Sequence, residues 1–150
     1  LGDVYKRQGL TSAPAIGKYV YDLVGEKYPA KAKENFIKYR KGITKVMELP
    51  LEKRNQLIAK NPLYGHIVCF CENVSAGEII EAINRPLSPT TIDGLKRRIR
   101  VGMGKCQSGF CLNKSMKLLS QELNKDIFTI TKNGKHSTYL VGLNKEVNHE

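Results

Sequence analysis

Four cysteines constrain this chain more than any other feature of its sequence. Cys69 and Cys71 form a C-x-C pair, Cys106 and Cys111 form a C-x4-C pair, and the pairs are separated by the thirty-four residues 72–105. Four thiolates in two close pairs can enclose a single tetrahedral zinc ion or an iron–sulfur cluster. Glycines favour the cluster, because they let backbone N–H groups fold closely around a bulky anion. These glycines are Gly102, Gly104 and Gly109.

Length, charge and cysteine use narrow the function classes. With 150 residues the chain can form one or two small domains. Its net charge of +11 indicates good solubility or an anionic partner. We do not expect nucleic acid, since the chain has no Trp and no basic strand interleaved with aromatic residues. We recognise neither a signal peptide nor an apolar run of the ~20 residues that a membrane span needs. Cysteines in this context indicate metal or redox chemistry in the cytoplasm.

Three runs around the cysteines carry a resemblance to a known family. They are Val68-Cys69-Phe70-Cys71-Glu72, Ser75-Ala76-Gly77-Glu78 and Arg97-Arg98-Ile99-Arg100-Val101-Gly102-Met103-Gly104-Lys105-Cys106-Gln107-Ser108-Gly109-Phe110-Cys111. Together they resemble the [2Fe-2S] domain of bacterioferritin-associated-ferredoxin-like (BFD-like) proteins. Stand-alone ferredoxins of that family usually have C-x2-C as the second pair. The C-x4-C spacing is similar to the branch at the C-terminus of anaerobic glycerol-3-phosphate dehydrogenase catalytic subunits and related flavin oxidoreductases.

The resemblance implies a site and a function. Cys69, Cys71, Cys106 and Cys111 would all be ligands of a [2Fe-2S] cluster, which would transfer single electrons as the C-terminal domain of an FAD-dependent dehydrogenase. FAD would belong to the full-length parent only, and the fragment alone would have no catalytic residues. The parent's substrate would be glycerol-3-phosphate, although opine- or amine-oxidising flavoproteins fit nearly as well. Two alternatives remain: a structural zinc module, and a basic protein-docking module without redox activity.

The N-terminal quarter divides into two expected segments. Residues 3–8 match a translated transposase end sequence from sequencing libraries, so we expect residues 1–8 to be an artefact. Residues 9–25 are expected to form one helix, capped at Thr11 or Ser12. This helix resembles the last helix of the FAD-binding domain in amino-acid-oxidase-like flavoproteins. The resemblance implies that Leu10, Thr11 and Ser12 lie near the flavin, at the positive end of the helix dipole.

The remaining chain predicts a mainly α fold. Residues 26–65 read as a connector with a short helix at 51–60, and residues 66–124 as the small helical cluster domain. Ser75 and Glu78 have capping-box spacing, and further helices are expected at about 91–101 and 111–124. Each cysteine pair then lies just before a helix start, where N–H groups favour an anion. Residues 125–150 predict a β-hairpin around Asn133-Gly134, followed by a tail.

Basic residues crowd the helix before the second cysteine pair. They are Lys96, Arg97, Arg98 and Arg100. We interpret them as charges that raise the cluster potential and form a docking face for an electron-acceptor protein or subunit; the alternative is that they are only solvated helix charges. The expected partners are therefore this acceptor and the upstream FAD domain of the same protein. Such an acceptor could also hold the protein at the membrane periphery.

Overall fold

The computed structural model describes residues 2–29, 31 and 33–143, so the tail expected from residue 144 lies outside the described residues. The chain forms two compact units, Leu1–Arg40 and Lys41–Glu150. The sequence divides the chain elsewhere, at 25/26 and 65/66, and those boundaries stay predictions. No helix in the described part is long and apolar enough to span a bilayer.

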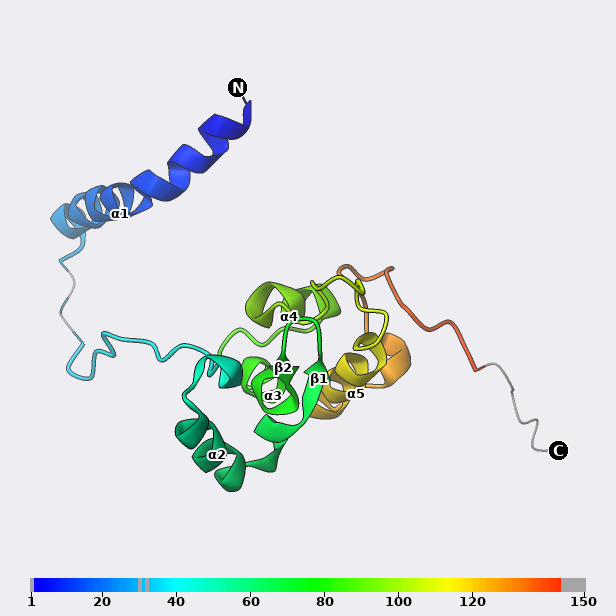
Figure 1. The fold of residues 1–150 in the computed structure, drawn as a ribbon. Helices are drawn as coiled ribbons and strands as arrows, with labels where there is room; N and C mark the ends of the chain where they lie inside the picture. Colours follow the sequence, from blue (N-terminus) through cyan, green and yellow to red (C-terminus); the bar gives the residue numbers. More distant parts are fainter. Residues whose placement is uncertain (1, 30, 32, 144–150) are drawn as a thin grey trace. The chain divides into compact units, whose positions relative to one another are not determined.

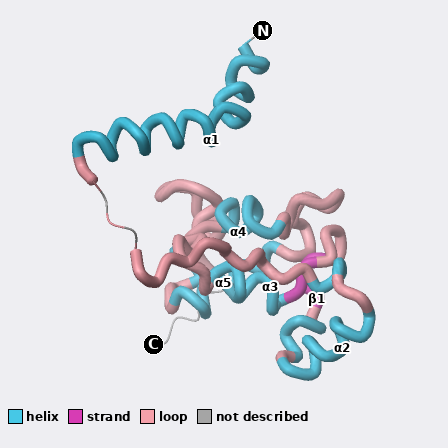
Figure 2. The backbone as a smooth tube through the Cα atoms, turned by 90° about the vertical axis from the view of Figure 1, so that its left-hand side faces the viewer, coloured by secondary structure: helices cyan, strands magenta, loops and turns pink. Residues whose placement is uncertain are grey.

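The first unit contains one helix, α1 (Gly2–Lys27). It begins well before Thr11 and Ser12, so the predicted N-cap at these residues is wrong. A capping side chain acts only where the preceding backbone is not helical, and here the helix continues through both residues. Pro14 lies inside α1, where a proline removes a hydrogen bond and bends a helix; Figure 2 shows that α1 is not straight. Its apolar face, which includes Ile16 and Val20, is about half exposed.

The second unit is built around α3 (Ala76–Ile83), which packs against both α4 (Ile92–Ile99) and α5 (Leu112–Leu123) (Figure 1). Two short antiparallel strands, β1 (Ile67–Cys69) and β2 (Val74–Ser75), precede α3. α3 is apolar on most of its surface, and burial of such side chains from several elements supplies the main folding energy. The fully buried large side chains are Ile79, Ile83, Leu95, Met116, Leu119, Ile130, Val46, Val68 and Val101.

Local sequence signals set the helix boundaries. Ser75 caps α3 in a complete capping box, in which its hydroxyl accepts from the Glu78 N–H and the Glu78 carboxylate accepts from the Ser75 N–H. Thr91 caps α4 by accepting from the Gly94 N–H at 3.1 Å. The short helix α2 (Leu51–Lys60) has the bounds that the sequence predicts. Two 3₁₀ turns flank it, η1 (Val46–Glu48) and η2 (Pro62–Gly65).

Two carboxylates of α3 hold the segment that leads into the second unit. Glu81 accepts from the Thr44 N–H and the Tyr64 hydroxyl, each at 3.1 Å, and pairs with Arg85 at 2.8 Å. Arg85 also donates to the backbone carbonyls of residues 41 and 42. One turn earlier, buried Glu78 accepts from the Val46 N–H at 3.3 Å. Residues 41–46, which the sequence places in a connector, are therefore fastened to the cluster unit.

The C-terminal segment forms less sheet than the sequence predicts. The mainly α class is confirmed and a β-hairpin is present, but its strands are β1 and β2. At 127–141 the chain instead forms the 3₁₀ turn η3 (Ile127–Thr129) and one isolated bridge between Thr131 and Thr138. The backbone carbonyls of Thr131 and Lys132 accept from the first N–H groups of α4, at 3.1 and 2.9 Å. Satisfying these otherwise unpaired N–H groups competes with a longer strand pair.

Replacing Glu81 is expected to loosen this attachment. Desolvation opposes ionisation of Glu81, but hydrogen bonds from Arg85, Thr44 and Tyr64 outweigh it and hold the carboxyl pKa below its ordinary value of 4.5. Its stabilisation is therefore present above pH 4.5 and is lost as the pH falls through the lower, folded-state pKa. Glu81→Gln should lower the free energy of unfolding at pH 7 by about 1–2 kcal/mol in urea titrations followed by circular dichroism.

The matched control is Glu48→Gln, which breaks the exposed Lys45–Glu48 pair. This variant should lose less than about 0.5 kcal/mol, as exposed ion pairs do. The difference between Glu81→Gln and the parent should narrow in acid below pH 4.5. Equal stability of the two Gln variants at pH 7 would contradict the role given to Glu81.

Candidate metal centre

The fold brings the two cysteine pairs together from two loops. Cys69 ends β1, and Cys71 lies in the turn of residues 70–73 that joins β1 to β2. Cys106 lies in the loop between α4 and α5, and Cys111 is the N-cap residue of α5. Cys69 and Cys111 are buried, Cys106 is half-buried and Cys71 is exposed, and all four are free thiols. The site thus lies at the boundary between core and surface.

Two glycines allow the second loop to approach the cysteines. A Cβ atom on Gly104 would overlap the Cβ of Cys71 and lie 3.3 Å from its Sγ. A Cβ atom on Gly102 would overlap the Ser108 hydroxyl and lie 3.9 Å from the Sγ of Cys111; Gly102 also has a left-handed φ of 81°. Both positions therefore require glycine, one for space and one for space and conformation. The expectation that these glycines serve the cysteine site is consistent with this geometry.

Backbone N–H groups of the second loop converge on Cys106. Hydrogen bonds lower the pKa of its thiol, first from the Phe110 N–H, then from the Cys71 thiol, and also from the N–H groups of Ser108 and Gly109. Gln107 and Ser108 have left-handed φ values of 50° and 72°. Successive N–H groups in such turns form a concave anion-binding nest. The loop can thus stabilise negative charge on a thiolate or on a group bound to it.

The two buried thiols, those of Cys69 and Cys111, also lie close together. Burial raises the pKa of Cys111 to about 11, and the charge and hydrogen bond of Cys69, followed by the charge of Cys106, contribute to the same shift. These interactions link Cys111 with Cys69, just as a hydrogen bond links Cys106 with Cys71. Each C-x-C thiol therefore faces one thiol of the second pair. A metal centre must displace the proton of Cys111, so its positive charge would replace that proton as the stabilising partner.

The helix that follows Cys111 contains one buried polar group without a partner in the described residues. Ser115 lies one turn after Cys111 on the same side of α5, and its side chain is buried. Within the described residues its hydroxyl has no hydrogen-bond partner.

Across the same residues, no three side chains of His, Cys, Asp or Glu form a group suited to one metal ion. Four thiols in two facing pairs, converging N–H groups and a glycine cradle form a donor set that fits a four-thiolate [2Fe-2S] cluster.

A comparison with family models agrees with this donor set. Residues 67–121 match the model of the BFD-like [2Fe-2S] binding domain. These residues are similar to that domain family. The matched range begins with β1, ends within α5 and includes all four cysteines. The [2Fe-2S] cofactor expected from the sequence is therefore confirmed at the level of the domain, and the assignment of each ligand stays a prediction.

Relatives extend the similarity beyond the domain. The chain is 43% identical over 140 residues to a glycerol 3-phosphate dehydrogenase of Caloramator mitchellensis, and the match covers 91% of this chain and 29% of that protein. It is 36% identical over 69 residues to one subunit of the anaerobic glycerol-3-phosphate dehydrogenase of Haemophilus influenzae, covering 46% and 12%. A third relative, hydrogen cyanide synthase subunit HcnB of Pseudomonas aeruginosa, is 41% identical over 46 residues, covering 31% and 10%. No solved structure matches the chain.

The remaining predicted residues belong to the first unit, whereas the cysteines belong to the second. Leu10, Thr11 and Ser12 lie within α1 in the first unit, and their role near a flavin stays a prediction. Phe70 and Phe110, which lie beside cysteines of the two pairs, have exposed rings that were not predicted as part of the site. Their signal was their place inside the two cysteine motifs, but a Phe there could equally have faced the core. The backbone conformation of each loop decides whether the ring faces the core or the solvent.

Gly104→Ala tests whether the two loops must approach this closely. The added methyl would overlap Cys71, so the loop must move away from it. We expect reconstituted protein to lose most of its bound iron and sulfide and its visible absorption. Gly134→Ala is the matched control, since a Cβ there meets no atom within 4 Å. Parent-like iron content in Gly104→Ala would contradict the requirement for close approach.

Proposed function

We propose that this chain transfers single electrons through a [2Fe-2S] cluster held by Cys69, Cys71, Cys106 and Cys111. The observation that carries the proposal is the pairing of thiols from two distant loops inside a BFD-like domain. When bound, such a cluster supplies a one-electron redox centre whose potential depends on charge, hydrogen bonds and burial. The chain's own residues hold the thiolates in place and offer N–H donors to them. In this proposal the site contains no general base or nucleophile.

The protein's residues would divide this work between the two loops. The N–H groups of Ser108, Gly109 and Phe110 stabilise the negative charge of Cys106. The N-terminus of α5, where Cys111 occupies the N-cap position, adds the positive end of a helix dipole. Burial of Cys69 and Cys111 excludes water from one side of the site, and exposed Cys71 leaves the other side open. Electrons would therefore enter or leave past Cys71.

We further infer that the parent protein is an FAD-dependent dehydrogenase similar to glycerol-3-phosphate dehydrogenase. The 43% identity over 91% of the chain supports this inference. The chain spans less than a third of that relative, so FAD, substrate and catalytic residues would lie in other parts of the parent. HcnB carries a similar segment under a different enzyme name, so the segment itself does not select a substrate. A cytoplasmic location and an electron-acceptor partner are part of this proposal.

A structural zinc site is the competing function for four thiols. Its supporting observation is the chemistry of the ligands alone, since four cysteines also suit zinc. Against it stands the C-x-C spacing of the first pair, because the cysteine pairs of structural zinc sites are usually C-x2-C to C-x4-C. The converging N–H groups are also not required by a four-coordinate structural zinc. Metal analysis distinguishes the two functions directly. A third possibility, docking without a metal, predicts neither metal nor colour.

The chain, reconstituted with iron and sulfide, should bind about two irons and two sulfides, as four-thiolate [2Fe-2S] ligation requires. It should be red-brown and should become paramagnetic on one-electron reduction, as measured by electron paramagnetic resonance. Cys71→Ser should change the visible spectrum and lower the iron content. A Cys71→Ser variant with the full parental spectrum would remove Cys71 from the ligand set. Colourless protein with one zinc per chain would support the structural alternative.

The same chain should neither retain FAD nor oxidise glycerol-3-phosphate by itself. It lacks the glycine-rich strand–turn–helix that holds the pyrophosphate in dinucleotide-binding folds. Dialysis of protein incubated with FAD, followed by flavin fluorescence, measures retention. Yellow protein that keeps its flavin through dialysis would contradict this expectation.

A further inference from the structure

The two loops that carry the cysteines expose three large apolar side chains, which we call the apolar centre. Phe70, between the two cysteines of the first pair, is 71% exposed, and Phe110, next to Cys111, is 81% exposed. Met103, beside the glycine that contacts Cys71, is 40% exposed. Large apolar side chains that gather on an exposed surface indicate a contact with a partner. All three lie within the two loops that carry the cysteines.

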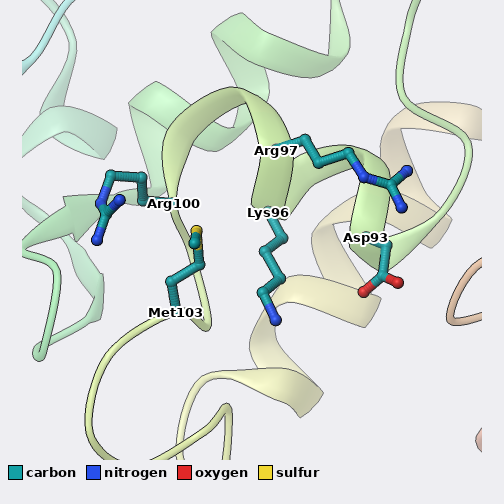
Figure 3. Close-up of a pocket in the computed structure, with 5 residues that line it drawn as sticks. All are labelled: Asp93, Lys96, Arg97, Arg100 and Met103. Atoms are coloured by element: carbon teal, nitrogen blue, oxygen red, sulfur yellow. The ribbon is translucent and has the colours of Figure 1, made fainter. Parts of the chain in front are cut away.

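Cationic side chains line the hollow next to this apolar centre. A hollow of about 440 Å³ is lined by Asp93, Lys96, Arg97, Arg100 and Met103. Figure 3 shows that Lys96 and Met103 extend into the same space, while Arg97 and Arg100 lie on opposite sides of it. Between Ile92 and Lys105 the sequence has five basic residues and a single acidic one, Asp93. The hollow therefore joins the apolar centre to a positively charged rim.

The basic residues of α4 do not share one role. Arg98 donates to the backbone carbonyls of Gly94 and Leu87, so it fastens the loop before α4. Arg100 pairs with Glu72 at 2.8 Å and thereby ties the end of α4 to the turn that carries Cys71. In the described part of the chain, the side chains of Lys96 and Arg97 have no hydrogen bond or ion pair. These two charges remain available to a partner.

We propose that this surface, defined by Phe70, Met103, Phe110, Lys96 and Arg97, docks an acidic electron-carrier protein. The inference rests on the proposed electron-transfer function, because it names the kind of partner that the site serves. An apolar centre surrounded by a charged rim is the usual anatomy of a protein–protein interface. The rim is cationic, so complementarity selects a partner with carboxylates around its own contact surface. Docking there would bring the partner against the exposed side of the site, at Cys71.

An anionic membrane is the other class of partner that basic and aromatic residues could meet. The structure favours a protein, because the carboxylates of Asp93 and Glu72 lie within or beside the same surface. Each of them pairs with one cation at the rim, Lys132 and Arg100 respectively. Fixed carboxylates would be repelled by a layer of anionic headgroups, whereas an acidic protein can place its own charges between them.

The test measures binding of the reconstituted full chain to flavodoxin, an acidic electron carrier, by isothermal titration calorimetry. Lys96→Gln with Arg97→Gln should weaken binding about tenfold at low salt, and the loss should shrink to about twofold or less in high salt. Phe110→Ser should weaken binding at both salt concentrations, because apolar contact is not screened. The matched control, Lys114→Gln with Lys117→Gln, removes two exposed charges of α5 outside this surface and should bind like the parent.

Several outcomes would overturn the proposal. The first is that the parent chain does not bind flavodoxin at low salt. The second is that the α5 control loses as much affinity for flavodoxin as the Lys96→Gln with Arg97→Gln variant. The third is that the parent chain binds basic cytochrome c as tightly as it binds flavodoxin. Co-sedimentation with vesicles that mix phosphatidylserine and phosphatidylcholine, without flavodoxin binding, would assign the surface to a membrane instead. Iron and sulfide contents are measured on every variant. A chain without a cluster that still binds flavodoxin would leave the docking surface intact and reject the proposed function.

Discussion

The close approach of the loop at Gly104 to Cys71 is the constraint on which the site depends. Neither loop can move far, because each is held at both ends by regular structure. The first loop is held by β1, β2 and the capping box that starts α3, and the second by α4 and α5. Only a residue without a side chain fits where they meet. The helices thus serve mainly to set the distance between two short turns.

Charged side chains of the second unit have three distinct roles. Buried or half-buried carboxylates of α3 bind backbone N–H groups and fasten residues 41–46 to the helices. Arg98 and Arg100 reinforce the ends of loops near the cysteines. Lys96 and Arg97 make no such bonds within the described residues and face the hollow.

Large apolar side chains are exposed in both units. In the cluster unit this exposure includes the rings beside the cysteines and also Leu51, Leu87 and Val141, whereas in α1 it runs along a helix face. An amphipathic helix obtains most of its stability from packing of its apolar face. The face of α1 has no core within the described part of its own unit. The glycerol 3-phosphate dehydrogenase relative is a longer protein, and this chain spans less than a third of its length.

The sequence by itself determined the helices of the cluster unit and indicated the chemistry of its cysteines. Capping residues and helical periodicity are local signals, so α2, α3, α4 and α5 could be predicted, and the paired cysteines indicated the chemistry. The tertiary structure decided what depends on contacts between distant residues. It chose which thiols face each other and turned Phe70 and Phe110 outward. It also reduced the C-terminal hairpin to one bridge, because the carbonyls of Thr131 and Lys132 cap α4. Propensity near Asn133 could not reveal that competition, since the N–H groups involved are some forty residues earlier in the chain.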